Sequence, residues 1–372
     1  TFGTRAMAYG ELWGAIESFA GSLLDGGLER GDRVVLALPN GPGFLIGFYG
    51  AQRAGGIAVP VAPESGVGRV SDLAALCDAA AVVVADGIDR DAERALAELV
   101  GSARRRLLTL GDGLRPRPAP TVAVEGEDIA FLQYTSGSTG DPKGVMLTHT
   151  GLLTNMDQMI AGMGITKEDS FVSWLPLYHD MGLIAGFLLP LVQGLPLVLM
   201  SPFDWVRHPA LLLRAIHDHQ GTLCWLPNFA YNHSARRIRA RDLEGISLAS
   251  VRAFINCSEP VRDDSHRLFL GRFADQGLRP EMLAVSYAMA ENTFAVTQTP
   301  IGLCLLFSAI VYFIIFGRFI LPAGAGESAP AGDPPRRRPG TRRDGPLRAG
   351  LPRGTRLVRL LPGGCRWVPA LR

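Results

Sequence analysis

Lysine is almost absent from this sequence of 372 residues, in which Lys143 and Lys167 stand against 35 arginines. A lysine that persists beside so strong a preference for arginine marks a position to inspect for chemistry. Cysteine is also sparse, and none of the five cysteines forms a Cys-x-x-Cys pair. That scatter disfavours a zinc site or a disulfide framework and fits a reducing compartment.

Net charge is small as well, at +2, which argues against a dedicated nucleic-acid-binding protein. The charge is uneven, because residues 322–372 hold eleven arginines and three acids, which leaves −6 for the rest of the chain. The chain does not begin with Met, and no basic segment followed by an apolar one lies near Thr1. We expect a fragment of a longer cytoplasmic protein, with no secretory signal in view.

The hydrophobic fraction of 47% excludes a mostly disordered protein and allows a sizeable core. Residues 1–298 alternate between helical and strand-like patterns, which predicts an α/β fold of layered, mostly parallel sheets with flanking helices. The predicted strands are 32–38, 57–61, 81–85, 129–134, 145–147, 196–200 and 223–226. The predicted helices are 12–25, 44–54, 73–76, one from about residue 149, and 209–219. We expect residues 104–120, which are polar and contain proline, to form a loop.

The composition changes near Pro300. Residues 301–321 are apolar apart from Arg318, and residues 322–372 contain nine prolines and nine glycines. The second composition cannot bury a core. We therefore divide the chain into a domain over 1–298, an apolar segment over 299–321 that is long enough for a transmembrane helix, and a disordered tail over 322–372.

The strongest chemical signal is the segment Tyr134–Gly144 (YTSGSTGDPKG) between two predicted strands. Glycines let a backbone approach a phosphate closely, and the hydroxyls and Lys143 add donors and a positive charge. A flexible hairpin loop is the structural alternative, but the unbroken run of hydroxyl and glycine residues favours phosphate binding. A Walker A loop is excluded because Pro142 and Gly144 flank the lysine. The Gly-x-Ser-x-Gly pattern of hydrolases is also absent, since Ser136 lies two residues before Ser138.

This loop resembles that of the adenylate-forming superfamily, which includes acyl-CoA synthetases and peptide-synthetase adenylation domains. Three further segments agree, in the family's order: Trp174–Leu183 (WLPLYHDMGL), Asn256–Arg262 (NCSEPVR) and Tyr287–Glu291 (YAMAE). The His-Asp-Met-Gly form of the first is typical of fatty-acyl-AMP ligases. The resemblance covers residues 1–298 and implies the large N-terminal domain of that fold.

The resemblance implies a role for each motif. His179 would lie beside the reacting carboxylate, Tyr287 would stack on adenine, and Glu291 would bind Mg²⁺ next to the ATP phosphates. The structural alternatives are a core histidine, a core tyrosine and a solvated helix acid, and Asp180 is expected to be structural. The catalytic candidates are Lys143, His179 and Glu291. The cofactor-binding candidates are Thr135, Ser136, Gly137, Ser138, Thr139, Gly140, Lys143, Cys257, Ser258, Glu259, Pro260 and Tyr287.

Two further groups carry weaker expectations. Met181, Trp225 and Phe229 are candidates for an acyl pocket, although apolar residues at such spacing are more often core. The basic run at 236–241 (RRIRAR) is expected to be a solvated helix face, with docking of an acidic carrier protein as the alternative.

The resemblance implies ATP-dependent activation of a fatty acid to an acyl-adenylate with release of pyrophosphate. The acyl group would pass to an acyl carrier protein or, in the alternative of an acyl-CoA synthetase, to CoA. ATP and Mg²⁺ are the expected cofactors. A third alternative is a non-catalytic nucleotide-binding remnant.

The sequence departs from the family pattern at two places. Ala288 stands where the family has glycine, which a negative φ would allow. After about residue 299 the family's ribose-binding aspartate, hinge and catalytic lysine are missing, so we expect impaired activity. An aberrant C-terminus, such as a frame change, is favoured over a transmembrane helix. A single span would separate the cytoplasmic ligase from the arginine-rich tail, which also prefers the cytoplasm.

Overall fold

The computed structural model describes residues 6–100, 106–110, 119–135, 143–302 and 318–319. These residues all fall within one compact unit, Thr1–Pro322. The predicted tail and most of the apolar segment lie outside the described residues, so the boundaries at 298 and 321 stay predictions.

The first sheet has six strands in the order β4-β3-β1-β2-β5-β6, parallel except for the antiparallel β5–β6 hairpin. Its strands are β1 (Arg33–Ala37), β2 (Ile57–Pro60), β3 (Ala79–Ala85), β4 (Arg106–Leu110), β5 (Ile129–Thr135) and β6 (Lys143–Thr148).

Both faces of this sheet are covered, which explains the continuous apolar run in β1. Val34 and Leu36 belong to the core cluster that includes α1 (Tyr9–Asp25) and α2 (Pro42–Arg53). Val35 and Ala37 belong to the cluster with α3 (Gly66–Leu76) and α4 (Arg90–Val100). Alternate residues of a strand point to opposite faces, so a strand buried on both sides shows no polar alternation.

The second sheet has seven strands in the order β13-β12-β11-β10-β9-β7-β8, with β12 and β13 antiparallel to their neighbours. Its strands are β7 (Phe171–Ser173), β8 (Leu197–Leu199), β9 (Leu223–Leu226), β10 (Ala253–Asn256), β11 (Leu283–Ala288), β12 (Ala295–Gln298) and β13 (Arg318–Phe319). The predicted α/β architecture of layered sheets and flanking helices is confirmed.

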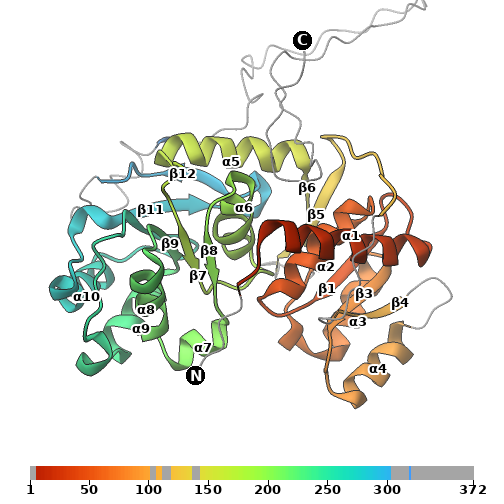
Figure 1. Ribbon diagram of the computed structural model, residues 1–372, viewed down its shortest axis with the longest axis horizontal. Coiled ribbons are helices and arrows are strands. Elements are labelled where there is room, and N and C mark those ends of the chain that lie inside the picture. Colours follow the sequence, from red (N-terminus) through yellow and green to blue (C-terminus); the bar gives the residue numbers. More distant parts are fainter. Residues whose placement is uncertain (1–5, 101–105, 111–118, 136–142, 303–317, 320–372) are drawn as a thin grey trace, which may run out of the picture. The chain divides into compact units, whose positions relative to one another are not determined.

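The helices connect these strands and cover the sheets (Figure 1). They are α1 (Tyr9–Asp25), α2 (Pro42–Arg53), α3 (Gly66–Leu76), α4 (Arg90–Val100), α5 (His149–Met163), α6 (Leu189–Gln193), α7 (Pro202–Arg207), α8 (Ala210–His219), α9 (Asn228–Arg237) and α10 (Asp263–Phe273). Short 3-10 turns include η6 (Ala290–Asn292), and η2 (Met181–Leu188) is a π-helix.

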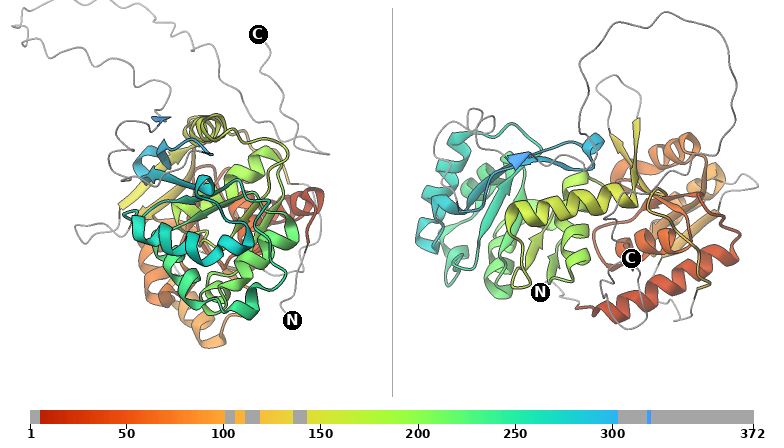
Figure 2. Two further views of the ribbon diagram at one scale, coloured as in Figure 1. Left: turned by 90° about the vertical axis from the view of Figure 1, so that its left-hand side faces the viewer. Right: turned by 90° about the horizontal axis from the view of Figure 1, so that it is seen from above.

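Helix α5 has well-defined ends. The hydroxyl of Thr148 accepts a hydrogen bond from the Gly151 N–H at 3.1 Å, and Gly164 ends the helix in the left-handed conformation. The helix follows β6 directly and runs beside β12 of the second sheet (Figures 1 and 2).

The expected loop over residues 104–120 is wrong in part, because Arg106–Leu110 forms β4 and pairs in parallel with β3. The prolines and arginines of the longer segment hid a short Leu-Leu-Thr-Leu run. A five-residue edge strand gains its stability from its one neighbour rather than from its own composition.

Within the apolar segment 301–321, Arg318 and Phe319 pair with β12 as β13, so these two residues are strand rather than helix. Residues 303–317 lie outside the described part of the chain. In the portion that is described, every helix is too short or too polar to cross a membrane.

Candidate functional site

The two ends of the phosphate-loop motif meet in the β5–β6 hairpin. Thr135 ends β5, Lys143 begins β6, and these two residues are partners in the antiparallel pairing. Lys143 is exposed. The loop residues Ser136, Gly137, Ser138, Thr139 and Gly140 lie outside the described residues. The hairpin therefore fixes where the loop leaves and re-enters the sheet, with Lys143 at its end.

The ring of Tyr134 covers the start of β6. A Cβ at Gly144 would lie only 3.0 Å from Cζ of that ring, so a side chain there would have to displace it. Burial raises the pKa of the Tyr134 phenol, which keeps the group neutral. Gly144 thus serves close packing next to Lys143.

His179 and Asp180 stand at the start of the π-helix η2. Nδ1 of His179 lies 2.7 Å from Oδ1 of Asp180, and the same oxygen accepts a hydrogen bond from the Met181 N–H at 2.6 Å. Burial opposes a charged imidazole, but the hydrogen bond and the charge of Asp180 outweigh it and raise the pKa of His179. The His179 side chain is 55% exposed. It is therefore not the core histidine of the structural alternative, whereas Asp180 orients both the ring and the helix start.

Two glycines explain how η2 packs so closely. A Cβ at Gly182 would lie 2.1 Å from the carbonyl oxygen of Pro176, and one at Gly186 would lie 2.8 Å from Oγ of Ser173. All eight residues of η2 are buried. Phe187 of this helix contacts the rings of Phe44 and Tyr49 of α2, which joins the helix to the core of the first sheet.

The segment predicted to line the adenine follows the carboxyl end of β10. Cys257 is fully buried, and burial raises the pKa of its thiol to about 12. A buried thiol that stays protonated is a poor nucleophile. Ser258 adopts a positive φ of 68°, which is uncommon for a residue other than glycine. Ser258, Glu259 and Pro260 are exposed.

Ser258 joins this segment to the His-Asp motif. Its hydroxyl donates to Sδ of Met181 at 3.6 Å and to Sγ of Cys257 at 3.8 Å. Asp180 is near enough to Cys257 for its charge to contribute to the raised pKa of the thiol. The structure thus brings together two motifs that lie about 80 residues apart in the sequence.

Glu259 has a structural contact of its own. Its Oε2 accepts a hydrogen bond from the Phe229 N–H at 2.8 Å, in the first turn of α9. An acceptor there satisfies a backbone donor that the helix leaves unpaired and complements the helix dipole. The side chain of Glu259 therefore caps a helix, which leaves its backbone for any contact with a nucleotide.

Two buried asparagine amides, of Asn228 and Asn256, stabilise the segment that follows β10. Asn228 Oδ1 accepts from the Arg262 N–H at 3.0 Å and from the Asn256 amide at 3.2 Å. The Asn256 amide also lies 2.9 Å from Nε2 of His266, whose pKa burial lowers to about 4. Sequence analysis missed this network. The available signal was the occurrence of polar residues within otherwise apolar stretches.

Tyr287 lies near the end of β11, and Glu291 lies on the connection from β11 to β12. The Tyr287 ring is 49% exposed, and Glu291 is exposed in the turn η6. Ala288, where the family has glycine, has a negative φ, as the substitution requires. Among the described residues, no cluster of three His, Cys, Asp or Glu side chains could hold a metal ion.

The three acyl-pocket candidates differ in their surroundings. Trp225 is 1% exposed and stacks on Phe171 at 5.6 Å, so it belongs to the core. Met181 is buried under Ser258, and only Phe229, at 44%, is exposed. The arginines of the basic run at 236–241 are exposed, as expected of a solvated face.

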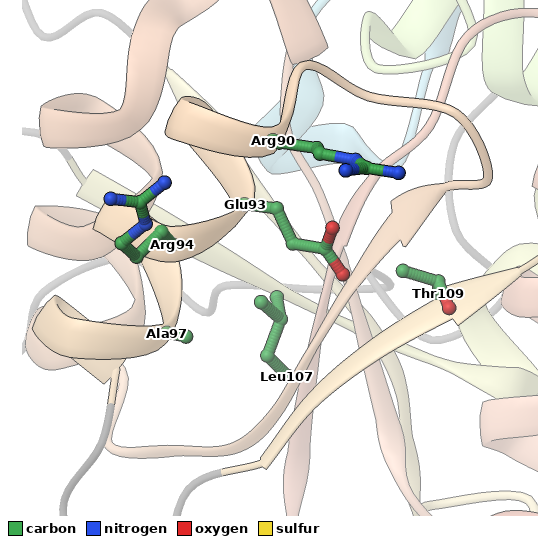
Figure 3. A pocket seen from close by; sticks show the side chains of 6 residues that line it. All are labelled: Arg90, Glu93, Arg94, Ala97, Leu107 and Thr109. Carbon is green, nitrogen blue, oxygen red and sulfur yellow. The ribbon is translucent and has the colours of Figure 1, made fainter.

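A cavity of about 560 Å³ lies elsewhere, between α4 and the edge strand β4 (Figure 3). Arg90, Glu93 and Arg94 line it from α4, and Leu107 and Thr109 from β4. None of the motif residues contributes to it. The candidate site is therefore defined by its converging motifs and not by this cavity.

Residues 1–305 match the AMP-binding enzyme family. The chain belongs to this family. The resemblance to adenylate-forming enzymes, drawn from four motifs, is thereby confirmed.

Relatives within this AMP-binding family point to fatty-acid ligases. The long-chain-fatty-acid–AMP ligase FadD26 of Mycobacterium marinum is 34% identical over 282 residues, covering 73% of this chain and 48% of the relative. The medium-chain-fatty-acid–[acyl-carrier-protein] ligase JamA of Moorena producens is 32% identical over 289 residues, covering 74% and 48%. The chain spans about half the length of these curated relatives.

A solved structure agrees with these relatives. The fatty acyl-adenylate ligase from L. pneumophila, in complex with acyl adenylate and pyrophosphate, matches with a TM-score of 0.73 and 32% identity. The match covers 80% of this chain and 52% of that one. The AMP-binding domain of this chain therefore shares the fold of a fatty-acid-activating enzyme.

Proposed function

We propose that this AMP-binding enzyme activates a fatty acid with ATP, with residues 1–298 as its adenylation domain. A carboxylate oxygen of the acid would attack the α-phosphorus of ATP. The bond from that phosphorus to the bridging oxygen would break, giving an acyl-adenylate and pyrophosphate. Positioning and neutralisation of charge carry such a reaction, because little covalent work falls to the protein.

The observation that carries the proposal is the contact between Ser258 and Met181. It brings the segment proposed to hold adenine against the His-Asp motif proposed to lie beside the carboxylate. A nucleotide and an acid would thus meet where the reaction needs them. The raised pKa of His179 favours the charged imidazole, which attracts a carboxylate.

The remaining roles follow the same arrangement. Lys143 and residues 135–140 would bind the β- and γ-phosphates, Tyr287 would stack on adenine, and the backbone of residues 257–260 would line its edge. Mg²⁺ is usually bound by one or two carboxylates together with waters and substrate phosphates, which the exposed Glu291 fits. The ion would supply positive charge to the triphosphate.

The acceptor in this proposal is the thiol of an acyl carrier protein, and the similarity to JamA, a fatty-acid–[acyl-carrier-protein] ligase, supports this choice. Use of ATP places the enzyme in the cytoplasm. Competition between a carrier protein and CoA for the same acyl-adenylate tests the acceptor, and thioester formation only with CoA would show an acyl-CoA synthetase instead.

Hydroxamate trapping of the adenylate with fatty acids of graded length tests the activity. Loss of one contact to the reacting charge commonly costs about 2.7–4 kcal/mol, so Lys143→Ala and Glu291→Gln should each reduce the rate at least about tenfold. Lys167→Ala is the matched control, because Lys167, the second of the two lysines, bonds to the carbonyl of Gln193 away from the motifs. Full activity in both site variants would refute the assigned roles, and no adenylate from the unaltered chain would favour the non-catalytic alternative.

A further inference from the structure

A buried asparagine in α5 holds the start of β12 by two hydrogen bonds. Nδ2 of Asn155 donates to the carbonyl oxygen of Ala295 at 2.9 Å, and Oδ1 accepts from the Ala295 N–H at 3.1 Å. Asn155 is 5% exposed. Its amide thus pairs with one residue of backbone in the way a neighbouring strand would.

The position of this asparagine is unfavourable for a helix considered alone. Its neighbours on the buried side of α5 are Leu152, Met156 and Met159, so an apolar residue would continue the pattern. Asparagine has lower helix propensity than leucine, and burial of an amide is costly unless its hydrogen bonds are made. The two bonds to Ala295 satisfy that requirement and give the residue a specific partner.

The backbone just before Ala295 carries strain. Thr293 has φ 68° and ψ −63°, and the Phe294 N–H donates to the Asn292 carbonyl at 2.8 Å, which closes a γ-turn of the rare positive-φ type. Such a conformation is costly and persists only where the surroundings enforce it. The turn directly follows Glu291.

Helix α5 supplies that enforcement at two points. Oγ1 of Thr293 lies 3.6 Å from where a Cβ of Gly151 would be, so the turn packs on the first turn of the helix. About one turn later, Asn155 holds Ala295. The carbonyl of Ala295 also accepts from Nδ2 of Asn292 at 2.9 Å, which ties the turn to the same anchor.

The helix also leads back to the phosphate loop. It begins at His149, immediately after β6, and β6 begins at Lys143. If α5 is rigid, it fixes the distance between Lys143, at the start of β6, and the turn that follows Glu291. The path from Lys143 through β6 and α5 to the turn of Glu291 is therefore continuous, and Asn155 is its last link.

We propose that Asn155 is a positioning residue, which sets the carboxylate of Glu291 relative to Lys143 for metal-bound nucleotide. This inference rests on the proposed function. Residues that orient a metal ligand commonly change metal affinity about 10–100-fold when they are replaced. Loss of the two hydrogen bonds between Asn155 and Ala295 should therefore raise the Mg²⁺ concentration that binding requires, while nucleotide can still bind without the metal.

The test measures the melting temperature of the full chain with ATP while Mg²⁺ is titrated. Asn155→Asp keeps the acceptor for the Ala295 N–H but places a second oxygen against its carbonyl. Thr293→Gly removes the packing of the turn against Gly151. It is the second variant, for use if Asn155→Asp does not fold. Val82→Ala, a fully buried truncation in β3 of the first sheet, lowers stability without touching the turn.

We expect at least about tenfold more Mg²⁺ for half of the stabilising effect in Asn155→Asp and in Thr293→Gly, and an unchanged requirement in Val82→Ala. Adding Asn155→Asp to Glu291→Gln should change nothing further. An unaltered Mg²⁺ requirement in both Asn155→Asp and Thr293→Gly would overturn the inference. If ATP stabilises the unaltered chain but Mg²⁺ adds nothing, the inference fails while nucleotide binding stands. If ATP gives no stabilisation at all, the proposed function fails and the inference with it.

Discussion

A methyl group added at Gly182 would meet the carbonyl oxygen of Pro176. The two atoms would be 2.1 Å apart, which is 1.3 Å short of the 3.4 Å at which ordinary contact begins. The obstacle is backbone, so no rotation of a side chain can relieve it. Gly182→Ala must therefore shift either the π-helix η2 or the turn that precedes it.

The expected cost is at the upper end of that for overpacking, about 3 kcal/mol, because the surrounding helix is buried on all sides. Alanine favours helix over glycine by about 1 kcal/mol, which leaves a net loss of stability of about 2 kcal/mol. The shift begins three residues from His179, so adenylate formation should also fall.

Urea unfolding at neutral pH measures the first effect. Gly162→Ala in α5 is the matched control, because a Cβ there meets nothing within 4 Å, and it should stabilise the protein by about 0.5–1 kcal/mol. Gly182→Ala is thus expected to lower the free energy of unfolding, and Gly162→Ala is expected to raise it. If Gly182→Ala left the urea midpoint unchanged, or raised it as Gly162→Ala does, the close packing of η2 would be refuted.

Three further predictions rest on burial and capping. Burial lowers the pKa of His266 from 6.5 to about 4. Between these two pH values, His266 is mostly protonated in the unfolded chain and mostly neutral in the native chain, so a falling pH favours unfolding. Stability should drop by up to about 3 kcal/mol between pH 7 and pH 4, and His266→Gln should flatten that slope in urea titrations at several pH values. Glu259→Ala removes the acceptor for the Phe229 N–H and should cost about 1 kcal/mol. Glu259→Gln, whose amide oxygen can still accept, should cost less, and equal losses would contradict the cap. The Cys257 thiol, with a pKa of about 12 and no exposure, should resist iodoacetamide at pH 8 until urea unfolds the chain, and mass spectrometry of that peptide would detect any native labelling.

The sequence predicted the order and type of most elements in the first sheet because each strand there is a continuous apolar run between turn residues. It missed β4, which is short and lies in a polar stretch. It also missed β10, which the segment predicted to line the adenine follows, and β11, which contains Tyr287. Periodicity is a weak guide for strands of four to six residues, whose pairing partners decide their conformation.

The candidate site divides in a similar way. The motifs named Lys143, His179 and Glu291 as candidates, and the structure shows that all three are exposed. Their roles stay predictions. Trp225 lies in the core, which is the alternative expected for most apolar residues at such spacing, because spacing alone cannot distinguish a pocket wall from the core. For Glu259, the motif gave no sign that its side chain caps α9.

The sequence by itself determined the family of this protein, because each of the four motifs that identify it consists of contiguous residues. Only the tertiary structure decided how those motifs are held. The contact of Ser258 with Met181 joins residues 77 positions apart. The hydrogen bonds of Asn155 with Ala295 join residues 140 positions apart. Such pairs leave no local pattern, since their energy depends on the packing of both sheets and not on any neighbour in the chain.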